Sequence, residues 1–211
     1  MFNISLTNAD NNSTIPILNT QISLIINKIN NLLHSTDHTT EVLPIIVAID
    51  GMSGSGKTTL GKLLHKTFPE SNLFHMDDYF LQPHQKTEER LSQPGGNVDY
   101  ERFKSEILAH LNNKKGLAYQ VYDCRSQTLQ PQRFISWKPL VIIEGAYSQH
   151  PYFNDPYTLR IFCEISNAEQ RQRILKRNGE FMLKRFQTEW IPKENLYFET
   201  FHIKEKADSL L

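Results

Sequence analysis

At 211 residues the chain is long enough for one domain with a substantial core, and we expect no second full domain. It carries 23 lysines and arginines against 23 aspartates and glutamates, so no long-range field would draw it to nucleic acid or to an anionic membrane. The apolar runs are too short to span a bilayer and the N-terminus has no signal-peptide pattern, so we expect a cytoplasmic protein whose two distant cysteines stay reduced.

The N-terminal region predicts a helix and then a buried strand. Isoleucines and leucines recur at helical spacing from Ile17 to Leu33, which predicts a helix of about four turns after a polar tail. We expect residues 1–41 to form this tail and helix, with the helix packed on the core. The next run, 42–49, is apolar on both faces and therefore predicts a central strand that is covered on both sides.

A glycine-rich turn follows that strand directly. It reads Gly-Met-Ser-Gly-Ser-Gly-Lys-Thr, a complete G-x-x-x-x-G-K-[ST] phosphate loop, and a helix-like stretch comes next. The backbone N–H groups of such a turn point into one concavity at a helix N-terminus and attract polyphosphate, so ATP is the expected donor. Lys57 would reach the β- and γ-phosphates, and the Thr58 hydroxyl would bind Mg²⁺. The predicted nucleotide-binding residues are Gly51, Met52, Ser53, Gly54, Ser55, Gly56, Lys57, Thr58 and Thr59.

The middle of the chain predicts a second strand and an excursion from the main sheet. The strand runs from Asn72 to Met76 and ends in Asp77 and Asp78. Residues 82–100 are rich in charge and in proline and glycine, which is typical of a long functional loop. A helix is expected next. This helix would cover 100–112, and two short segments outside the main sheet would cover 119–122 and 133–137.

The rest of the chain predicts three more strands and two helices. The strands are expected over 139–145, 159–165 and 207–211. The helices are expected over 168–177 and 181–190, with a break near Asn178 and Gly179. Strands that are nearly all apolar and that alternate with helices indicate a parallel sheet covered on both faces, so the fold class is α/β.

Residues 194–199 read Glu-Asn-Leu-Tyr-Phe-Glu, which is similar to a protease-recognition tag. The stretch continues without a break into Thr-Phe-His-Ile-Lys-Glu-Lys, so we interpret it as part of a native helix. We expect Trp190, Tyr197 and Phe198 to pack in the core rather than to stack on a base.

Four carboxylates fall at the carboxyl ends of the predicted strands, where ligands bind in open parallel sheets. Glu144 is expected to hold Mg²⁺ directly or through water, or alternatively to cap the next helix. Asp77 is the best candidate for the general base that takes the proton of an acceptor hydroxyl. It is also expected to be a further metal ligand. Asp78, which would point the other way in an extended chain, is expected to cap a turn or to help the metal shell. Asp50 is expected to fix backbone geometry.

The only dense basic stretch of the chain lies between residues 171 and 185. It predicts a lid at about 171–190 that closes on ATP and stabilises charge on the transferring phosphoryl group. Arginine suits this role because its planar fork binds two phosphate oxygens. The alternative is the solvated face of a helix. The basic residues are Arg171, Arg173, Lys176, Arg177, Lys184 and Arg185.

Six segments occur in the order found in uridine kinases. They are Asp50-Gly-Met-Ser-Gly-Ser-Gly-Lys-Thr-Thr59, His75-Met-Asp-Asp-Tyr-Phe80, Gly96-Asn-Val-Asp-Tyr100, Val121-Tyr-Asp123, Val141-Ile-Ile-Glu-Gly145 and Arg173-Ile-Leu-Lys-Arg-Asn178. The chain therefore resembles the uridine kinase and phosphoribulokinase family of P-loop kinases, especially its short bacterial uridine-kinase-like members. The resemblance implies a P-loop NTPase fold with a five-stranded parallel sheet in the order 2-3-1-4-5. It places a kinase domain at 42–211, with a substrate region at about 80–137.

The resemblance also implies roles for single residues. Asp77 would be the base for the 5′-hydroxyl of a nucleoside, and Asp99 would bind ribose hydroxyls. Tyr122 would line the base pocket, and Arg177 would reach the phosphates. Two departures leave the identity of the base open. Gln127 stands near the place where uridine-cytidine kinases have a histidine, and the second lid arginine motif is missing after residue 178.

Three hypotheses follow for the function. The first is an ATP- and Mg²⁺-dependent kinase for the 5′-hydroxyl of a uridine- or cytidine-like nucleoside, with Asp77, Lys57 and Arg177 as catalytic residues. The second keeps this chemistry on nicotinamide riboside, pantothenate or a sugar phosphate. The third is a non-catalytic nucleotide-binding regulator, although the chain has neither an Asn-Lys-x-Asp nor a Leu-Ser-Gly-Gly-Gln motif. We expect a small-molecule partner, no nucleic acid and no membrane, and a homo-oligomer is left open.

Overall fold

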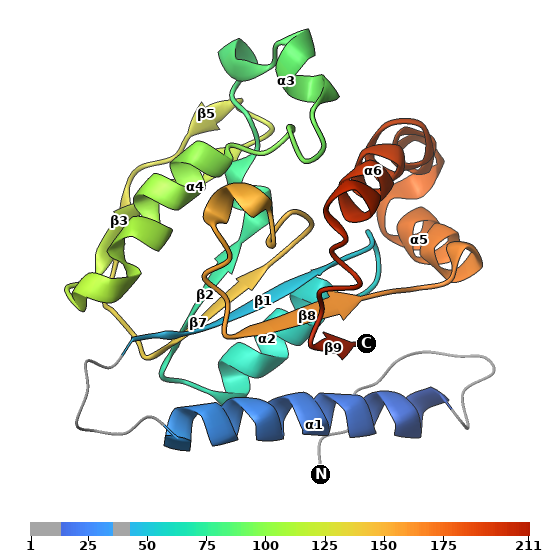
Figure 1. Ribbon diagram of the computed structural model, residues 1–211. Coiled ribbons are helices and arrows are strands. Elements are labelled where there is room, and N and C mark those ends of the chain that lie inside the picture. The colour runs from blue at the N-terminus through green and yellow to red at the C-terminus, as the bar shows by residue number, and fades with distance from the viewer. Residues whose placement is uncertain (1–13, 36–42) are drawn as a thin grey trace.

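A five-stranded parallel sheet forms the centre of the molecule (Figure 1). The structure, a computed structural model, describes residues 14–35 and 43–211. The strands lie in the order β2-β7-β1-β8-β9, which is 2-3-1-4-5 when they are numbered by rank along the chain. This is the order that the family resemblance implies. The strands are β1 (Ile45–Gly51), β2 (Ser71–His75), β7 (Leu140–Glu144), β8 (Leu159–Cys163) and β9 (Ser209–Leu210).

The two central strands, β1 and β7, are apolar for most of their length because both faces of the sheet are covered. Every residue of both strands is buried. Ile49 on β1 and His75 on β2 both lie opposite Glu144 on β7. Since the three strands run parallel, Asp50, His75 and Glu144 meet at one edge of the sheet, where their carboxyl ends lie.

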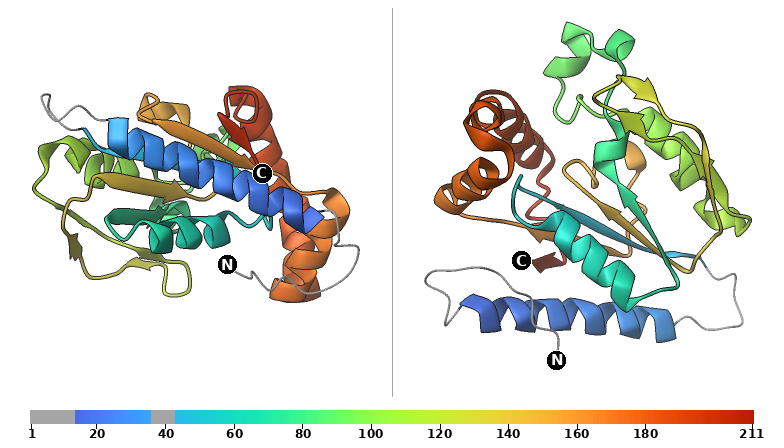
Figure 2. Two further views of the ribbon diagram at one scale, coloured as in Figure 1. Left: turned by 90° about the horizontal axis from the view of Figure 1, so that it is seen from below. Right: turned by 180° about the vertical axis from the view of Figure 1, so that it is seen from behind.

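Helices α1 (Thr14–Ser35) and α2 (Lys57–Thr67) cover one face of the sheet, as Figure 2 shows from two sides. The helix predicted over 17–33 is therefore present and somewhat longer. In the described part of the chain, α1 and the other helices all lack the combination of length and apolar character that crossing a membrane requires. The buried residues of this layer are Ile25, Ile29, Leu60 and Leu64, which pack with Val47, Ile49, Ile142 and Ile161.

The opposite face is covered by α4 (Tyr100–Glu106), a short turn at Pro151–Phe153 and α6 (Ile191–Phe201). The side chains of this layer are mostly aromatic. They include Phe103, Phe153, Tyr197 and Phe198, which pack with Ile46, Ala48, Val141 and Ile143. Tyr197 and Phe198 are thus core residues, as expected, and both faces of the sheet are covered as the α/β pattern predicts. The expectation for Trp190 was wrong, because this residue is only partly buried and packs against Phe186 and Arg185 outside the core.

The excursion between β2 and β7 is built from short elements. Two small antiparallel ladders form in it, one between β3 and β6 and one between β4 and β5. The region predicted as a loop, 82–100, contains a turn and a short helix because Thr87 caps that helix by accepting a hydrogen bond from the Arg90 N–H (3.1 Å). The elements are 3-10 turns at Met76–Tyr79, Pro83–Gln85 and Leu108–Asn113, α3 (Glu88–Ser92), β3 (Leu117–Tyr119), β4 (Tyr122–Asp123), β5 (Thr128–Leu129) and β6 (Arg133–Ile135).

The single helix predicted over 100–112 is wrong in its second half. Helix α4 ends at Glu106, and Ile107 (φ −106°, ψ −68°) departs from helical geometry before the chain continues as 3-10 turns. Ile107 and Leu111 are both buried in the aromatic core, so packing holds this segment although its backbone is not α-helical. A 3-10 segment can bury apolar residues that have the spacing expected of an α-helix, which explains the error.

The C-terminal helices show the predicted break. Helix α5 (Asn167–Arg185) contains Gly179 at φ 78° and ψ 173°, so two helical segments meet there at a kink. A π-turn at Phe186–Trp190 then leads into α6. Helices α5 and α6 lie side by side in Figure 1, and residues 194–199 are native helix as interpreted from the sequence.

His150 joins the excursion to α6. Its ring stacks on Tyr100 (4.4 Å between centroids) and lies parallel to the ring of Tyr197 (6.0 Å). Its Nδ1 accepts a hydrogen bond from the Tyr152 backbone N–H (3.2 Å). Gly95 passes so close that a Cβ there would lie 2.6 Å from the ring. Burial lowers the pKa of His150 to about 4, which keeps the ring neutral in the folded protein.

The neutral state of His150 predicts an acid sensitivity. The unfolded state binds a proton on this histidine below its ordinary pKa of 6.5 while the folded state does not, so stability is lost as the pH falls from 6.5 towards 4. Between pH 7 and pH 5 the wild type is expected to lose about 2 kcal/mol more of its unfolding free energy than His150→Phe. Urea unfolding at both pH values measures this difference. An equal loss in the two proteins would contradict it.

Candidate active site

The phosphate loop lies between β1 and α2, where the sequence predicted it. Gly51, at the end of β1, has φ +132°, and a Cβ there would lie 2.1 Å from the carbonyl oxygen of Cys163. Gly56, at φ +106°, directly precedes the first turn of α2. Both positions need glycine because L side chains rarely adopt such φ values. The strand, the turn and the helix therefore form the amide-lined concavity that binds anions at helix N-termini.

Lys57 and Thr58 begin α2 and place a cation and a hydroxyl beside this concavity. The Lys57 ammonium donates to the carbonyl oxygens of Gly51 (2.7 Å) and Met52 (3.0 Å), so it lies across the turn. The Thr58 hydroxyl donates to Oε2 of Glu144 (3.1 Å), which is the last residue of β7. Two of the three predicted metal ligands are thus in direct contact.

The contact between Thr58 and Glu144 provides oxygen donors of the kind that Mg²⁺ prefers. Mg²⁺ is usually held by one or two protein carboxylates together with substrate phosphates and water. Among residues 14–35 and 43–211 no group of three or more His, Cys, Asp or Glu side chains forms a metal cage. The hydroxyl of Thr58 and the carboxylate of Glu144 fit a magnesium ion whose remaining ligands are phosphates and water.

His75 is a contact of Glu144 that the sequence analysis missed. Its Nδ1 meets Oε1 of Glu144, the carboxylate oxygen that Thr58 does not use. This hydrogen bond raises the pKa of His75, and burial opposes the effect. His75 therefore orients the Glu144 carboxylate. Only the register of β2 and β7 reveals the pair, because the two residues are far apart in the sequence.

Asp77 lies in the 3-10 turn at Met76–Tyr79 and not in the extended chain that the sequence analysis assumed. The prediction that Asp77 and Asp78 lie in an extended chain, and so point to opposite sides of a strand, is therefore wrong about the backbone. Asp77 remains accessible to solvent, yet the surrounding protein desolvates it and raises its pKa, and the charge of Glu144 adds to the rise. The cations of Lys57 and Arg177 oppose this rise.

The neighbours of Asp77 show which predicted residues the fold brings together. Lys57 from α2, Glu144 from β7 and Arg177 from α5 all act on the same carboxyl group. Arg177 is itself exposed, and its Nε donates to the Asn178 side chain (2.7 Å). Residues that are separated by up to 120 positions in the chain, from Lys57 to Arg177, therefore surround one acidic group.

The basic stretch on α5 divides into residues with different contacts. Arg173 donates to the Gly54 carbonyl oxygen in the phosphate loop (3.1 Å) and pairs with Glu169. Arg185 pairs with Glu189 one turn further on (3.0 Å). The alternative of a solvated helix face thus describes Arg185, whereas Arg173 contacts the phosphate loop and Arg177 lies near Asp77.

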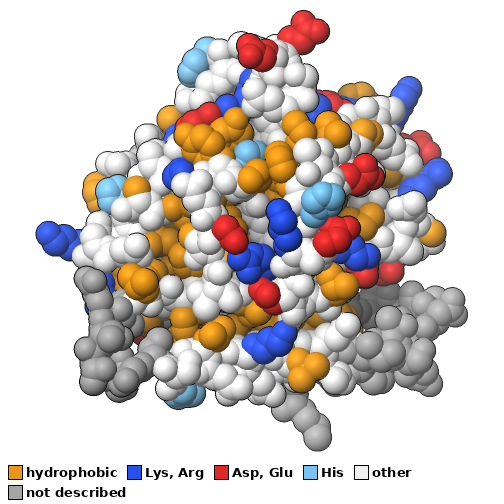
Figure 3. All heavy atoms as spheres, in the orientation of Figure 1, with side chains coloured by type: hydrophobic (Ala, Val, Ile, Leu, Met, Phe, Trp, Pro, Cys, Tyr) orange, Lys and Arg blue, Asp and Glu red, His pale blue; other side chains and the backbone are white. Residues whose placement is uncertain are grey.

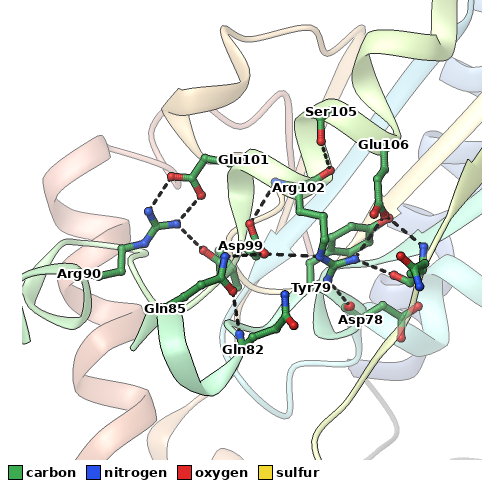
Figure 4. A network of polar contacts seen from close by, with 12 residues as sticks. Asp78, Tyr79, Gln82, Gln85, Arg90, Asp99, Glu101, Arg102, Ser105 and Glu106 are labelled. Carbon is green, nitrogen blue, oxygen red and sulfur yellow. Dashed lines mark hydrogen bonds and ion pairs between the residues drawn. The ribbon is translucent and has the colours of Figure 1, made fainter. Parts of the chain in front are cut away.

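The proposed substrate residues have unequal surroundings. Asp99 is 3% exposed and is held by three groups shown in Figure 4: Oδ1 accepts from the Arg102 N–H (3.0 Å), and Oδ2 accepts from Gln85 (2.9 Å) and lies 3.5 Å from Nε of Arg102. Tyr122 is also buried, and its hydroxyl has no hydrogen-bond partner within the described residues. Gln127 is exposed in the turn between β4 and β5, at φ 55°. The Asp99 carboxylate therefore serves as the N-cap of α4 and as an ion-pair partner of Arg102.

Arg102 is a second residue that the sequence analysis missed. Its guanidinium donates to the backbone carbonyl oxygens of Asp78 (2.9 Å) and Gln120 (2.7 Å) and stacks over the ring of Tyr79 at 4.1 Å, as Figure 4 shows in part. It thereby ties the turn that carries Asp77 to α4 and to Gln120, the residue that follows β3. An arginine on an amphipathic helix is usually solvated, so the sequence carries no signal for this role.

Asp50 has the structural role expected of it. Its carboxylate is fully buried and accepts hydrogen bonds from the N–H groups of Gly51 (2.7 Å), Tyr147 (3.2 Å) and Gln149 (3.0 Å) and from the hydroxyl of Tyr197 (2.8 Å). Burial raises the pKa of Asp50 to about 6 despite these donors. The carboxylate joins the start of the phosphate loop to the segment after β7 and to α6.

Asp99→Ala distinguishes a capping role from a ligand-binding role. Loss of the N-cap and of the contact with Arg102 is expected to lower the unfolding free energy by about 2 kcal/mol. Asp99→Asn keeps an acceptor for the Arg102 N–H and should lose less. Urea unfolding of the three proteins checks this order. If Asp99→Ala were as stable as the wild type, the cap would contribute nothing and a ligand-binding role would be favoured.

Comparison with known proteins places the chain among kinases by sequence similarity. It is 27% identical to a uridine kinase from Alkaliphilus metalliredigens over 147 residues, which cover 65% of this chain and 69% of that protein. It is 26% identical to a nicotinamide riboside kinase from Schizosaccharomyces pombe over 136 residues, which cover 59% of this chain and 57% of that protein. It is 32% identical to a uridine kinase from Brevibacillus brevis over 48% of this chain and 50% of that protein. The matches thus span about half to two thirds of these relatives.

Solved structures show the same fold. A possible uridine kinase from Bacillus stearothermophilus matches 92% of this chain and 99% of its own chain, with a TM-score of 0.66 at 23% identity. A D-glycerate 3-kinase from Cryptococcus neoformans matches 85% of this chain and 88% of its own, with a TM-score of 0.59 at 14% identity. No protein-family model matches the chain.

Proposed function

We propose that this chain, which has the fold of P-loop kinases and resembles the uridine kinase and phosphoribulokinase family, transfers the γ-phosphoryl group of ATP to the hydroxyl of a small molecule. The favoured acceptor is the 5′-hydroxyl of a uridine- or cytidine-like nucleoside. The single observation that carries the proposal is the electrostatic environment of Asp77: an accessible carboxyl group whose pKa is raised by desolvation and by the charge of Glu144, and lowered by the cations of Lys57 and Arg177. Such a group can take a proton beside bound phosphates.

The proposed reaction assigns a step to each residue. Asp77 accepts the proton of the acceptor hydroxyl while that oxygen attacks the γ-phosphorus, and the bond from phosphorus to the bridging oxygen breaks to leave ADP. Lys57, Arg177 and the N–H groups of residues 54 and 56–58 stabilise negative charge on the phosphate oxygens. Thr58 and Glu144 would hold Mg²⁺, which when bound neutralises charge on the phosphates.

The raised pKa of Asp77 supports its role as base. A general base works best when its pKa lies near the working pH, because it is then deprotonated and still holds a proton well. Desolvation and the charge of Glu144 both shift Asp77 in this direction. Burial also raises the pKa of Asp78, and the Asp78 backbone carbonyl accepts a hydrogen bond from Arg102. Asp78 serves as the matched control.

The acceptor is inferred from the relatives, whereas the chemistry is inferred from the site residues. Similarity to uridine kinases and to a nicotinamide riboside kinase favours a riboside as the acceptor. Asp99 is engaged in an N-cap and Gln127 is exposed, so these two residues do not specify the base of that riboside. Lysines and arginines lie among aspartates and glutamates on the face drawn in Figure 3, in keeping with a small-molecule partner and not nucleic acid. We place the substrate region at about 80–137, the lid at 171–190 and the protein in the cytoplasm.

Asp77→Asn tests the base. The amide cannot accept the proton, so kcat is expected to fall about a hundredfold or more, while the Kd for ATP stays within about twofold. Asp78→Asn should change kcat far less. Single-turnover transfer from radiolabelled ATP measures the rate, and calorimetry measures ATP binding. Unchanged turnover in Asp77→Asn would remove Asp77 from the mechanism.

An acceptor panel tests the substrate class. We expect ADP release with Mg²⁺, ATP and uridine or cytidine, and weaker or no release with nicotinamide riboside, pantothenate or a sugar phosphate. Coupled detection of ADP compares the acceptors at one concentration. Preference for nicotinamide riboside would keep the chemistry and change the substrate. Tight ATP binding with no ADP release from any acceptor would instead favour the nucleotide-binding regulator.

A further inference from the structure

A buried glutamate on α6 contacts the phosphate loop directly. Glu194 is 6% exposed; its Oε2 accepts the backbone N–H of Ser53 (2.9 Å) and its Oε1 accepts the Ser53 hydroxyl (2.5 Å). Ser53 is the third residue of the phosphate loop. Both donors of this residue are therefore directed to α6 and not to the concavity that would hold phosphates.

Helix α5 holds the same part of the loop through its carbonyl oxygens. Gln170 donates to the Ser53 carbonyl (2.9 Å) and Arg173 to the Gly54 carbonyl (3.1 Å). A Cβ on Gly54 would meet Ile174 at 3.6 Å, so the backbone packs closely on this helix. Together α5 and α6 satisfy both the N–H and the carbonyl group of Ser53.

Helix α6 also holds the entrance of the loop. Tyr197 lies three residues after Glu194 and therefore on the same face of the helix. Its hydroxyl donates to Oδ2 of Asp50 (2.8 Å), and Oδ1 of Asp50 accepts the Gly51 N–H. One face of α6 thus fixes both the first and the third residue of the loop.

The charge of Glu194 makes a purely structural role unfavourable. A carboxylate that is buried beside an anion-binding loop is costly, and burial raises the pKa of Glu194 while the cation of Lys57 opposes the rise. A glutamine or a serine could satisfy Ser53 without placing negative charge near phosphates. The gain must therefore come from a strong acceptor that sets the direction of the Ser53 peptide.

We propose that Glu194 is a positioning residue for nucleotide binding: it fixes Ser53 so that the N–H groups of residues 54 and 56–58 converge on the phosphates of the donor. This inference rests on the proposed function, because it assumes that the loop binds a nucleoside triphosphate. The arrangement also joins the proposed lid to the loop, since α6 follows α5 directly through the π-turn at 186–190.

The test measures ATP binding without turnover. Glu194→Ala removes both hydrogen bonds to Ser53 and is expected to weaken the Kd for ATP about tenfold by calorimetry. Glu194→Gln should weaken the Kd by an intermediate factor of about threefold, because its amide oxygen still accepts the Ser53 N–H but is a weaker acceptor than a carboxylate. Glu199→Ala, an exposed change on the same helix, is the matched control.

A double-mutant cycle connects the effect to the contact. Ser53→Ala keeps the backbone bond and loses the hydroxyl bond, so it should weaken binding less than Glu194→Ala. In the double variant the two losses should not add, because the hydroxyl bond is already absent. If Glu194→Ala does not fold, the Kd values of Glu194→Gln and Ser53→Ala for ATP still test the contact, because both variants should bind ATP more weakly than the wild type.

Three results separate the outcomes. If folded Glu194→Ala binds ATP as well as or better than the wild type, the inference is overturned, since the residue then only supports the fold or repels phosphates. If Glu194→Ala weakens binding while the wild type phosphorylates no acceptor, the inference stands and the proposed kinase activity fails. If the wild type binds no nucleoside triphosphate, both are overturned.

Discussion

The parallel register of β2, β7 and β1 is the constraint on which the rest of the structure depends. It places Glu144 opposite Ile49 on one side and opposite His75 on the other, so the residues that follow all three strands emerge at one edge. The phosphate loop, the turn that carries Asp77 and the contact between Glu144 and Thr58 all result from this register. A shift by one residue would turn Glu144 to the other face of the sheet and remove its contact with Thr58.

Local sequence signals predicted the covered parallel sheet and the position of the phosphate loop, and the family resemblance supplied the strand order. The glycine-rich turn between a buried strand and a helix predicted the phosphate loop because positive φ values and a lysine at that spacing have few other uses. Nearly continuous apolar strands predicted a covered parallel sheet. The contact of Thr58 with Glu144 and the electrostatic influence of Lys57 on Asp77 join residues chosen from the phosphate-loop motif with residues chosen from strand ends.

Contacts between distant segments could not be predicted in this way. Glu194 was considered only as part of a tag-like stretch, and its bond to Ser53 spans 141 positions of the chain. Arg102 looks like a solvated helix residue, and the 3-10 turn at 76–79 replaces the expected strand end. Asp99 matches a family motif, yet its carboxylate caps α4. Such roles depend on packing between elements, which composition and periodicity do not encode.

The measurement that tests the account most directly is a crystal structure with Mg²⁺, a non-hydrolysable ATP analogue and the acceptor that the panel selects. The account predicts phosphates on the N–H groups of the loop, the metal ion on Thr58 and Glu144, and the acceptor hydroxyl within about 2.6–3.2 Å of the Asp77 carboxylate, in line with the γ-phosphate. An acceptor bound away from Asp77, or a nucleotide bound outside the phosphate loop, would contradict it.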